Sequence, residues 1–425
     1  MTNTQTNAQP QPGSLFDVPG VPGGATQWYE GYEPIEGVVN NLSAQTQTTA
    51  NGLSPFQQTD VVLDWQMDLE VNQDYVVGTG QTLTDSPYAP FNVINAYQIK
   101  IQNTWNSVDV ENGIDLYAFN QIRPEYKFDR TNDYASIQGQ TLGSTGGNGV
   151  ITSSLSDTNQ VQKGWTNALS SYPIRLRIPA SQWFDRYFNL DANGEPIGPS
   201  FPALVSPVYL GGTTRNITPH CVFAPGFVSG LDVGPVNTTT LTASGDTAST
   251  YTGSVSQTYR RTAIFNASPV VMPEVYPWQY RWKTTRGAQG GVSGQSKITV
   301  LIPQDSGQIL SWYLRLWDPS ANGGLGAPVS TSNITNIKYV YGSNLARFNG
   351  TVADLQARWY RQHGKPFIPG AIVFDDAITQ RGQITNERCL NTIATGNMQV
   401  EVSFSSPLSS TAYAVLGVES LTYVI

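Results

Sequence analysis

The clearest pattern in the chain is an alternation of apolar and polar residues that begins at residue 61. Apolar side chains (Val61, Leu63, Trp65, Met67, Leu69 and Val71) alternate there with polar ones (Asp64, Gln66, Asp68, Glu70 and Asn72). Successive side chains of a β-strand point to opposite faces, so a period of two residues is typical of a strand with one buried face. The pattern therefore predicts a long strand that starts at Val61.

Shorter segments of the same kind follow in the first half of the chain. They lie at residues 93–101, 113–119, 173–178, 201–210 and 220–228. Turn-forming sequences separate several of them, including Gly-Gly-Asn-Gly at 146–149 and an Asn-Gly pair at 193–194, which is typical of hairpin turns. These segments predict one all-β unit over residues 59–228.

The alternation resumes after a polar stretch at residues 229–257. Apolar positions with a period of two recur in the second half, and an apolar run closes it. These segments lie at 298–302, 312–316, 337–341, 372–374, 398–404 and 413–425. Because this order repeats the plan of the first half, we expect a second β-unit over 258–425, with 229–257 as an inter-barrel linker or loop.

Few segments of the chain have the period of a helix. Residues 352–363 carry an apolar stripe with helical spacing, and Thr351 and Asp354 have the spacing of an N-terminal capping box. A shorter helix is expected at 181–189, where Ser181 is the candidate N-cap. The chain is therefore expected to be all-β, with two tandem eight-stranded jelly-roll barrels and a few short helices in their loops.

Residues 1–58 differ in composition from the rest of the chain. They are rich in Gln, Pro, Gly, Asn and Thr, and such a segment buries too little apolar surface to fold alone. We interpret it as an extended N-terminal arm, dispensable for folding, whose aromatic residues anchor on neighbouring subunits. The alternative is a disordered tail. The candidate anchors are Phe16, Trp28, Tyr29, Tyr32 and Phe56.

The low content of charged residues indicates what kind of surface the protein has. Charged residues make up 13% of the sequence, against roughly 25% in ordinary globular proteins. Such a composition is typical of β-rich proteins with polar loops and large subunit contacts. Residues 1–99 contain ten acidic side chains and no Lys, Arg or His. Because nucleic-acid binding requires clustered basic side chains, we expect no direct contact with nucleic acid.

The sequence also bears on where the protein is found. It has no apolar run of the roughly 18 residues that a membrane-spanning helix needs. The first residues lack the basic and apolar regions of a secretion signal. The protein is therefore expected to stay where it is made.

Histidine and cysteine are scarce, which limits the chemistry available. His220 adjoins Cys221, but two side chains do not complete a closed metal site, and no CxxC or HxxxH spacing occurs. His363 stands at the end of the expected helix, where a histidine typically caps the last carbonyls. Cys221 and Cys389 are expected to be buried free thiols.

Acidic pairs do not supply a catalytic site either. Asp375 and Asp376 are adjacent in an expected strand, so their carboxylates point to opposite faces and do not converge. No glycine-rich nucleotide loop or nucleophile-elbow pattern occurs. The sequence predicts no catalytic residue, no cofactor and no metal. The alternative that stays open is a glycoside-hydrolysing carboxylate pair that only the fold brings together.

Short motifs in the second half occur in a distinctive order. A strand ending in Gly precedes an Arg-Phe pair, an aromatic-rich helix, an apolar strand and a Gly-x-x-x-Asn turn. These are Tyr339–Gly342, Arg347-Phe348, Trp359-Tyr360, Ile372–Phe374 and Gly382–Asn386. The order resembles the double jelly-roll major capsid proteins of tailless icosahedral viruses, most closely those of tectivirus-like, lipid-containing phages. The first half resembles the opening of the same proteins through Leu83–Asp85, 93–101 and Ile114–Phe119.

This resemblance implies a structural protein and not an enzyme. It implies homotrimers with a pseudo-hexagonal outline that build an icosahedral shell over an internal membrane. The implied partners are further copies of the chain, penton or minor capsid proteins, and the internal membrane through peripheral contacts. The implied location is the virion, after synthesis in the host cytoplasm. A β-rich receptor-binding spike or adhesin, and a jelly-roll carbohydrate-active enzyme, are the competing classes.

Overall fold

The computed structural model of the protein describes about half of the chain. The described residues are 28–34, 39–40, 46–49, 61–76, 83–85, 94–101, 105–122, 164–165, 172–183, 188–190, 196–199, 208–209, 217–223, 236–238, 244–248, 250–264, 278–287, 291–303, 307–321, 326–342, 345–364, 366–368, 370–377, 390–392 and 396–423. Phe16, Phe56, Cys389 and the Gly382–Asn386 turn lie outside these residues.

Two sheets face each other in the C-terminal unit. One has the strand order β16-β25-β18-β22 and the other has the order β17-β24-β20-β21. The strands are β16 (Trp278–Arg286), β17 (Lys297–Ile302), β18 (Gln308–Asp318), β20 (Ile334–Tyr341), β21 (Leu345–Gly350), β22 (Ala371–Asp375), β24 (Met398–Phe404) and β25 (Tyr413–Tyr423).

The core of this unit lies between the two sheets and explains the sequence alternation. In β24, Met398, Val400 and Val402 are buried and the residues between them are partly exposed. Trp312 of β18 stacks on Phe374 of β22 with ring centroids 5.8 Å apart. Tyr339 of β20, in the opposite sheet, sets its ring edge-on to both at 5.3 Å. These aromatic contacts hold the two sheets together.

The N-terminal unit has the same strand order as the C-terminal unit. Its sheets run β1-β15-β4-β9 and β3-β13-β6-β7. The strands are β1 (Trp28–Pro34), β3 (Thr46–Thr49), β4 (Val61–Val76), β6 (Ile94–Ile101), β7 (Trp105–Val110), β9 (Tyr172–Trp183), β13 (Ile217–Phe223) and β15 (Thr250–Ile264). In chain order they correspond to β16, β17, β18, β20, β21, β22, β24 and β25.

In both units the first strand pairs with the last, and two antiparallel sheets form the order of a jelly roll. The helices occupy equivalent positions too. Helix α1 (Gly113–Ile122) follows β7, and α3 (Val352–His363) follows β21. The predicted double jelly-roll fold is therefore confirmed. Four short strands extend the large sheets: β2 (Val39–Asn40), β12 (Val208–Tyr209), β19 (Ala327–Pro328) and β23 (Leu390–Asn391). Five others form two small separate sheets, of order β10-β11 and β14-β5-β8: β5 (Leu83–Asp85), β8 (Gly164–Trp165), β10 (Phe188–Leu190), β11 (Pro196–Pro199) and β14 (Val236–Thr238). The strand order and not a strand count therefore defines the fold.

The helix expected at 352–363 has the predicted boundaries. The Thr351 hydroxyl accepts a hydrogen bond from the Asp354 backbone N–H, and the Asp354 carboxylate accepts one from the Thr351 N–H, which completes the capping box. Gly364 ends the helix in the left-handed conformation, with φ of 68°. Local capping chemistry therefore determined this element.

Two other local predictions are wrong. Residues 113–119 form helix α1 and not a strand. The Asn112 side chain accepts a hydrogen bond from the Ile114 N–H at its start, and Ile114, Leu116 and Phe119 are all buried. Because α1 is covered on several sides, it lacks the polar stripe that reveals a surface helix. The helix expected at 181–189 is also absent from the described residues, since Ser181–Trp183 end strand β9, which pairs with β4.

Long-range pairing also shifts the unit boundaries. Strand β1 lies inside the segment interpreted as an arm, yet it pairs with β15 from Trp28↔Ile264 to Pro34↔Thr258. Strand β3 of the same segment pairs with β13. Strand β15 crosses residue 257, where the sequence analysis ended the linker, and it pairs with β4 along its length. The N-terminal jelly roll therefore draws strands from both segments, and the units meet between β15 and β16.

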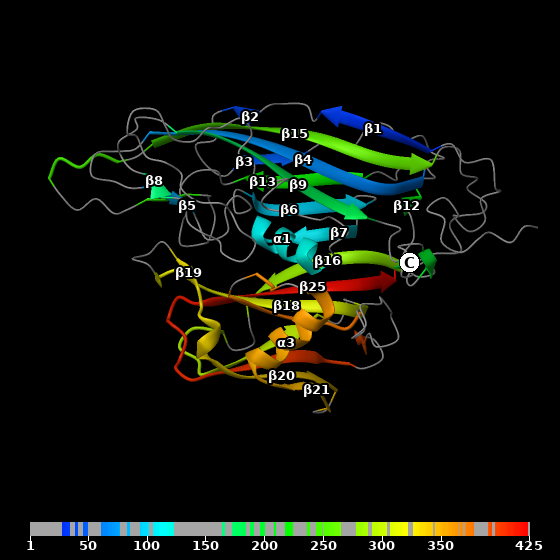
Figure 1. Cartoon of the computed structure of the whole chain (residues 1–425), viewed down its shortest axis with the longest axis vertical. Coiled ribbons are helices and arrows are strands. Elements are labelled where there is room, and N and C mark those ends of the chain that lie inside the picture. The colour runs from blue at the N-terminus through cyan, green and yellow to red at the C-terminus, as the bar shows by residue number, and fades with distance from the viewer. Residues whose placement is uncertain are drawn as a thin grey trace, which may run out of the picture.

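The two units share one continuous sheet. Strand β16 of the C-terminal unit runs parallel to β7 of the N-terminal unit, with Trp282↔Val108 and Lys283↔Asp109 as partners. The resulting sheet has the order β19-β18-β25-β16-β7-β6-β13-β3. Figure 1 shows it crossing the middle of the molecule, with the outer sheets of the two units on opposite sides. Backbone pairing thus joins the two jelly rolls directly.

Candidate functional site

A buried ion pair lies at the joint between the two units. Arg315 of β18 donates from Nε to Asp115 Oδ1 and from Nη2 to Asp115 Oδ2, each at 3.2 Å. Asp115 belongs to α1 of the other unit, and the side chains of Arg315 and Asp115 are 1% and 0% exposed. The Tyr313 hydroxyl donates to the same Asp115 Oδ1 at 2.9 Å. Two units are thus connected by a bidentate, charge-assisted contact.

The surroundings of this ion pair keep the Tyr313 hydroxyl protonated. Burial raises the pKa of Tyr313 well above its usual value, and the nearby Asp115 charge raises it further. The phenol therefore stays protonated and serves as a donor. The Phe119 ring of α1 stacks on Trp282 of β16 at 5.1 Å and meets Tyr313 edge-on at 5.3 Å. These rings exclude water from the ion pair.

The edge of the joint carries further polar contacts. The Glu111 N–H donates to the Thr284 hydroxyl at 2.7 Å. Arg286 Nε donates to the Glu111 carboxylate at 2.9 Å, in a partly exposed pair. Burial raises the pKa of Glu111 above its usual value, and Arg286 opposes that shift. With the parallel strand pair, these contacts fix one jelly roll against the other.

A second charged cluster lies beneath α3. Arg347 of β21 donates to Asp376 Oδ1 at 3.0 Å, and Arg358 of α3 lies 3.6 Å from the same oxygen. Burial raises the pKa of Asp376 to about 6, and the two guanidinium groups oppose that shift. Arg358 also donates to the Asp375 backbone carbonyl at 2.9 Å. The cluster attaches α3 to the end of β22.

His363 is buried at the end of α3. Its Nε2 lies 3.1 Å from Asp375 Oδ2, and the two side chains are 1% and 0% exposed. The His363 ring stacks on Trp359 at 3.6 Å. The Gly364 N–H donates to the Tyr360 carbonyl at the C-cap, and a capping role of His363 stays a prediction. The carboxylates of Asp375 and Asp376 have different partners, as their adjacent positions predicted.

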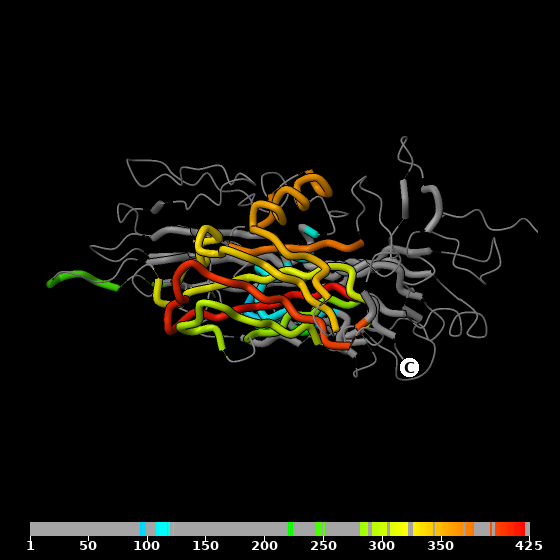
Figure 2. The backbone as a smooth tube through the Cα atoms, turned by 90° about the horizontal axis from the view of Figure 1, so that it is seen from below, coloured from blue at the N-terminus to red at the C-terminus, as the bar shows by residue number. Residues whose placement is uncertain are grey.

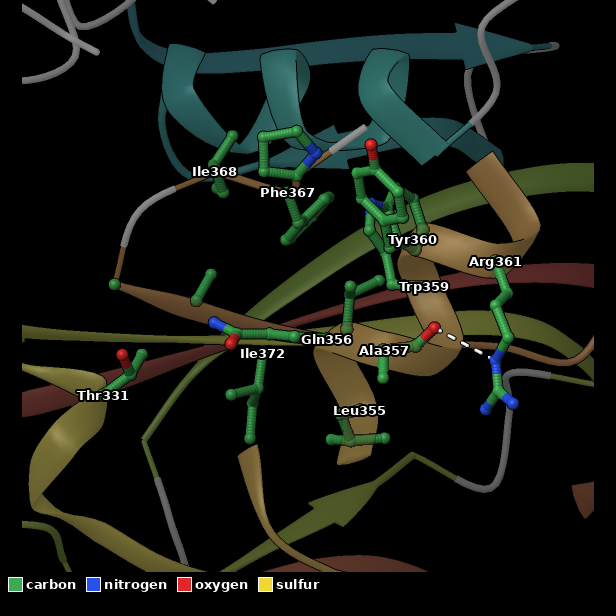
Figure 3. Close-up of a pocket in the computed structure, with 14 residues that line it drawn as sticks. Thr331, Leu355, Gln356, Ala357, Trp359, Tyr360, Arg361, Phe367, Ile368 and Ile372 are labelled. Atoms are coloured by element: carbon green, nitrogen blue, oxygen red, sulfur yellow. Dashed lines mark hydrogen bonds between the residues drawn. The ribbon is translucent and has the colours of Figure 1, made fainter. Parts of the chain in front are cut away.

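A cavity opens beside α3. Its volume is about 800 Å³, and α3, residues 366–368 and β22 provide most of its walls. Figure 3 shows Trp359, Tyr360 and Phe367 near one end and Gln356 and Ile372 along the other. Trp359, Tyr360 and Ile372 were expected only as parts of a helix and a strand, and none of the lining residues was predicted to bind a ligand.

The predicted arm residues are only partly within the described residues. Trp28, Tyr29 and Tyr32 belong to β1, so their backbone is part of the first sheet. Phe16 and Phe56 lie outside the described part of the chain. No described feature brings these residues to a second subunit, so their anchoring role stays a prediction.

Metal sites and membrane-spanning helices were not expected from the sequence. In the described part of the chain, no group of three or more His, Cys, Asp or Glu side chains is placed to hold a metal ion. None of the helices in the described segments is long and apolar enough to cross a membrane. His220 lies in β13, opposite Thr49 of β3 and Gln98 of β6.

The ion pair between the two units was not predicted from the sequence, because Asp115 and Arg315 are 200 positions apart. A weak signal was available. Arg315 stands between Leu314 and Leu316 in a strand whose interior is buried throughout. A charged residue within such a strand requires a buried partner, although the sequence does not say which one.

Comparison with solved structures places the fold among viral capsid proteins. The crystal structure of the STIV MCP aligns with a TM-score of 0.53 and 10% identity, over 93% of this chain and 97% of that chain. A structure of Sulfolobus Turreted Icosahedral Virus aligns at 0.52 and 11% identity, over 93% and 91%. The PBCV-1 virus capsid aligns at 0.50 and 9% identity, over 93% and 94%. No protein-family model and no curated protein matches the sequence. At these identities the likeness shows the fold: a double jelly roll over nearly the whole chain.

Proposed function

We propose that the protein is the major capsid protein of a tailless icosahedral virus. The observation that carries the proposal is the pair of equivalent jelly rolls joined through one sheet and one buried ion pair. Three such chains give six similar barrels, and a closed ring of six barrels has a near-hexagonal outline that tiles a shell. The same fold in the STIV and PBCV-1 capsid structures supports this reading.

A fixed joint suits this role. A lattice of hexagonal units requires the angle between the two barrels to be the same in every copy. A flexible linker gives a range of angles, whereas a shared sheet and a desolvated bidentate contact hold one. The joint is therefore the feature that makes the two barrels one building block.

The proposed role is structural and without catalysis. The buried carboxylates of Asp115, Asp375 and Asp376 all contact Arg or His side chains, which ties them to structural contacts. The proposed location is the virion, after synthesis in the host cytoplasm. The proposed partners are further copies of the chain, penton or minor capsid proteins, and an internal membrane through peripheral contacts. The acidic N-terminal 99 residues support a shell without direct nucleic-acid binding.

The test is the oligomeric state and shape of the purified protein. Light scattering at micromolar concentration is expected to give three times the chain mass of 46.2 kDa. Negative-stain microscopy of the same sample is expected to show compact, near-hexagonal particles. A folded monomer under these conditions contradicts the proposal, because the lattice needs a preformed ring of barrels.

A further inference from the structure

The cavity beside α3 is lined mainly by apolar and aromatic side chains. Figure 2 shows α3 standing out from the sandwich on one side of the C-terminal unit. The cavity lies between this helix, residues 366–368 and β22, and its volume is about 800 Å³. Leu355, Phe367 and Ile372 are among its walls. A volume of this size matches that of sites which bury a small molecule or a short peptide segment.

One end of the cavity is formed by aromatic rings. Trp359 and Phe367 meet edge-on with centroids 5.0 Å apart. Tyr360, on the next position of α3, is 60% exposed, which is unusual for so large a ring. Flat aromatic walls beside an open surface favour a ligand with rigid apolar rings of its own.

A buried donor stands at the same end. Trp359 is 2% exposed, yet its indole Nε1 has no hydrogen-bond partner in the described part of the chain. Leaving a buried donor unsatisfied costs about 1–3 kcal/mol, so native structures usually pair such groups. The His363 ring covers one face of the same indole at 3.6 Å. The indole is therefore an enclosed part of the cavity wall, and its N–H is covered in this structure.

Aromatic walls are the chemistry that recognises polyproline segments. Proline rings pack against aromatic side chains. A polyproline II helix has no internal hydrogen bonds, so its backbone carbonyls remain available as acceptors. Its extended conformation is largely present before binding, which lowers the entropic cost of ordering it.

The chain itself contains such a segment. Residues 8–23 read AQPQPGSLFDVPGVPG, with four prolines and the apolar pair Leu15-Phe16. The segment carries Asp17 and no basic residue, whereas the exposed Arg361 lies on the cavity wall. Composition and charge therefore both match the cavity. These residues lie outside the described part of the chain.

The length of chain before β1 allows a neighbouring copy to be reached. Twenty-seven residues precede Trp28, and a chain of that length reaches at most about 90 Å. Figure 1 shows β1 on the outer side of the N-terminal unit and α3 in the other unit. A segment bound to its own chain must pass along both units, whereas a neighbouring copy in a shell can present its cavity directly.

We propose that residues 8–23 of one copy bind in the α3 cavity of a second copy. The prolines pack against Tyr360 and Phe367. This inference rests on the proposed self-assembly of the chain. It assigns the N-terminal residues a specific acceptor site on the neighbouring subunit.

Photo-crosslinking of the full chain tests this assignment. The variant Phe16→p-benzoylphenylalanine is mixed with isotope-labelled wild-type chain, assembled and irradiated, and the crosslinked peptides are identified by mass spectrometry. We expect crosslinks from the photoreactive chain to residues 355–373 of the labelled chain. Unlabelled peptide 8–23 added in excess is expected to suppress them, and the same peptide with its four prolines replaced by alanine is not.

A matched pair of surface variants controls for the cavity. Tyr360→Ala removes an exposed aromatic wall and is expected to lower the crosslink yield about three- to tenfold, the effect of losing one aromatic contact. Leu345→Ala changes a side chain of similar exposure, 61%, on β21 and is expected to leave the yield unchanged. Both positions are exposed, so neither variant threatens folding.

The outcomes separate this inference from the proposed function. Assembled particles without crosslinks to the cavity overturn the inference and leave the shell function intact. Crosslinks only within one chain overturn the assignment to a second copy. An unchanged yield in Tyr360→Ala also overturns it. A protein that stays monomeric contradicts both proposals together.

Discussion

Asp115 and Arg315 form a bidentate ion pair between the two jelly rolls, with both N···O distances at 3.2 Å and almost no exposure of either side chain. Each residue belongs to a different unit, so the contact exists only when the two units are docked. A buried ion pair adds little net stability to the folded protein. Separating the two charges while both stay buried is costly, because each is then left without a partner. The relative placement of the barrels is thereby restricted to one geometry.

Removing one partner of this pair is expected to be costly. Arg315→Met leaves Asp115 buried without its counter-charge, and we expect a loss of about 3–5 kcal/mol in the free energy of unfolding. The triple variant Arg315→Met, Asp115→Leu, Tyr313→Phe removes all three polar groups and is expected to recover most of that stability. Denaturant unfolding followed by fluorescence measures both.

A surface pair provides the control for this prediction. Lys297→Met breaks the contact between Lys297 and Glu401, which is 3.0 Å long and partly exposed. A loss below about 1 kcal/mol is expected there. Equal effects of Lys297→Met and Arg315→Met contradict the special role of the joint. If the triple variant is stable and still assembles into particles, the ion pair contributes to stability alone. If it is stable but does not assemble, the ion pair also fixes the angle between the two barrels.

The pKa of Asp376 predicts a dependence of stability on pH. Its pKa is raised from 3.8 to about 6 in the folded protein, so between these values the folded state binds more protons than the unfolded state. Stability contributed by this group is therefore present at low pH and is lost as pH rises from about 4 to about 6. We expect the difference in unfolding free energy between wild type and Asp376→Asn to fall over this range. A difference that rises with pH, or is flat, contradicts the shift.

Deletion from the N-terminus is expected to give two different results. The arm interpretation of residues 1–58 predicts that the segment is dispensable for folding. Pairing of β1 with β15 and of β3 with β13 predicts the opposite for a deletion of residues 1–55, since both sheets of the first unit lose an edge strand. Deletion of residues 1–27 keeps β1 and is expected to leave a folded oligomer with a lower particle yield. Circular dichroism and light scattering distinguish the two.

Strand β4 offers a test of register. It lies between β15 and β9, with Trp65 opposite Arg261 and Gln182. The sequence alternation puts Trp65 on the buried face and Gln66 on the polar one. Trp65→Glu is expected to prevent soluble expression, because losing a buried tryptophan alone costs about 3–5 kcal/mol and burying a charge costs more. Gln66→Glu is expected to express normally. Soluble oligomers from both variants show that the face assignment is wrong.

The sequence by itself determined the elements whose cause is local. Period-two alternation identified the long strand β4 and most strands of the second unit. In β17 and β24 the alternation follows burial, because one face of each strand lies in the core. The capping box of Thr351 and Asp354 fixed the start of α3, since both hydrogen bonds join residues three apart. The repetition of these patterns in two halves, together with the resemblance to double jelly-roll capsid proteins, predicted the double jelly roll.

Tertiary structure alone decided the features that depend on distant partners. Strand β1 contains a glycine and a proline and has no apolar–polar alternation, and it is a strand because β15, more than 200 residues later, offers it a free edge. Helix α1 is buried on several sides, which removes the polar stripe that identifies a helix in a sequence. The Asp115–Arg315 pair and the cavity beside α3 likewise exist only once the chain is folded. Local periodicity reports how one residue faces a core, but it carries no information on which distant residue completes a strand pair, an ion pair or a cavity wall.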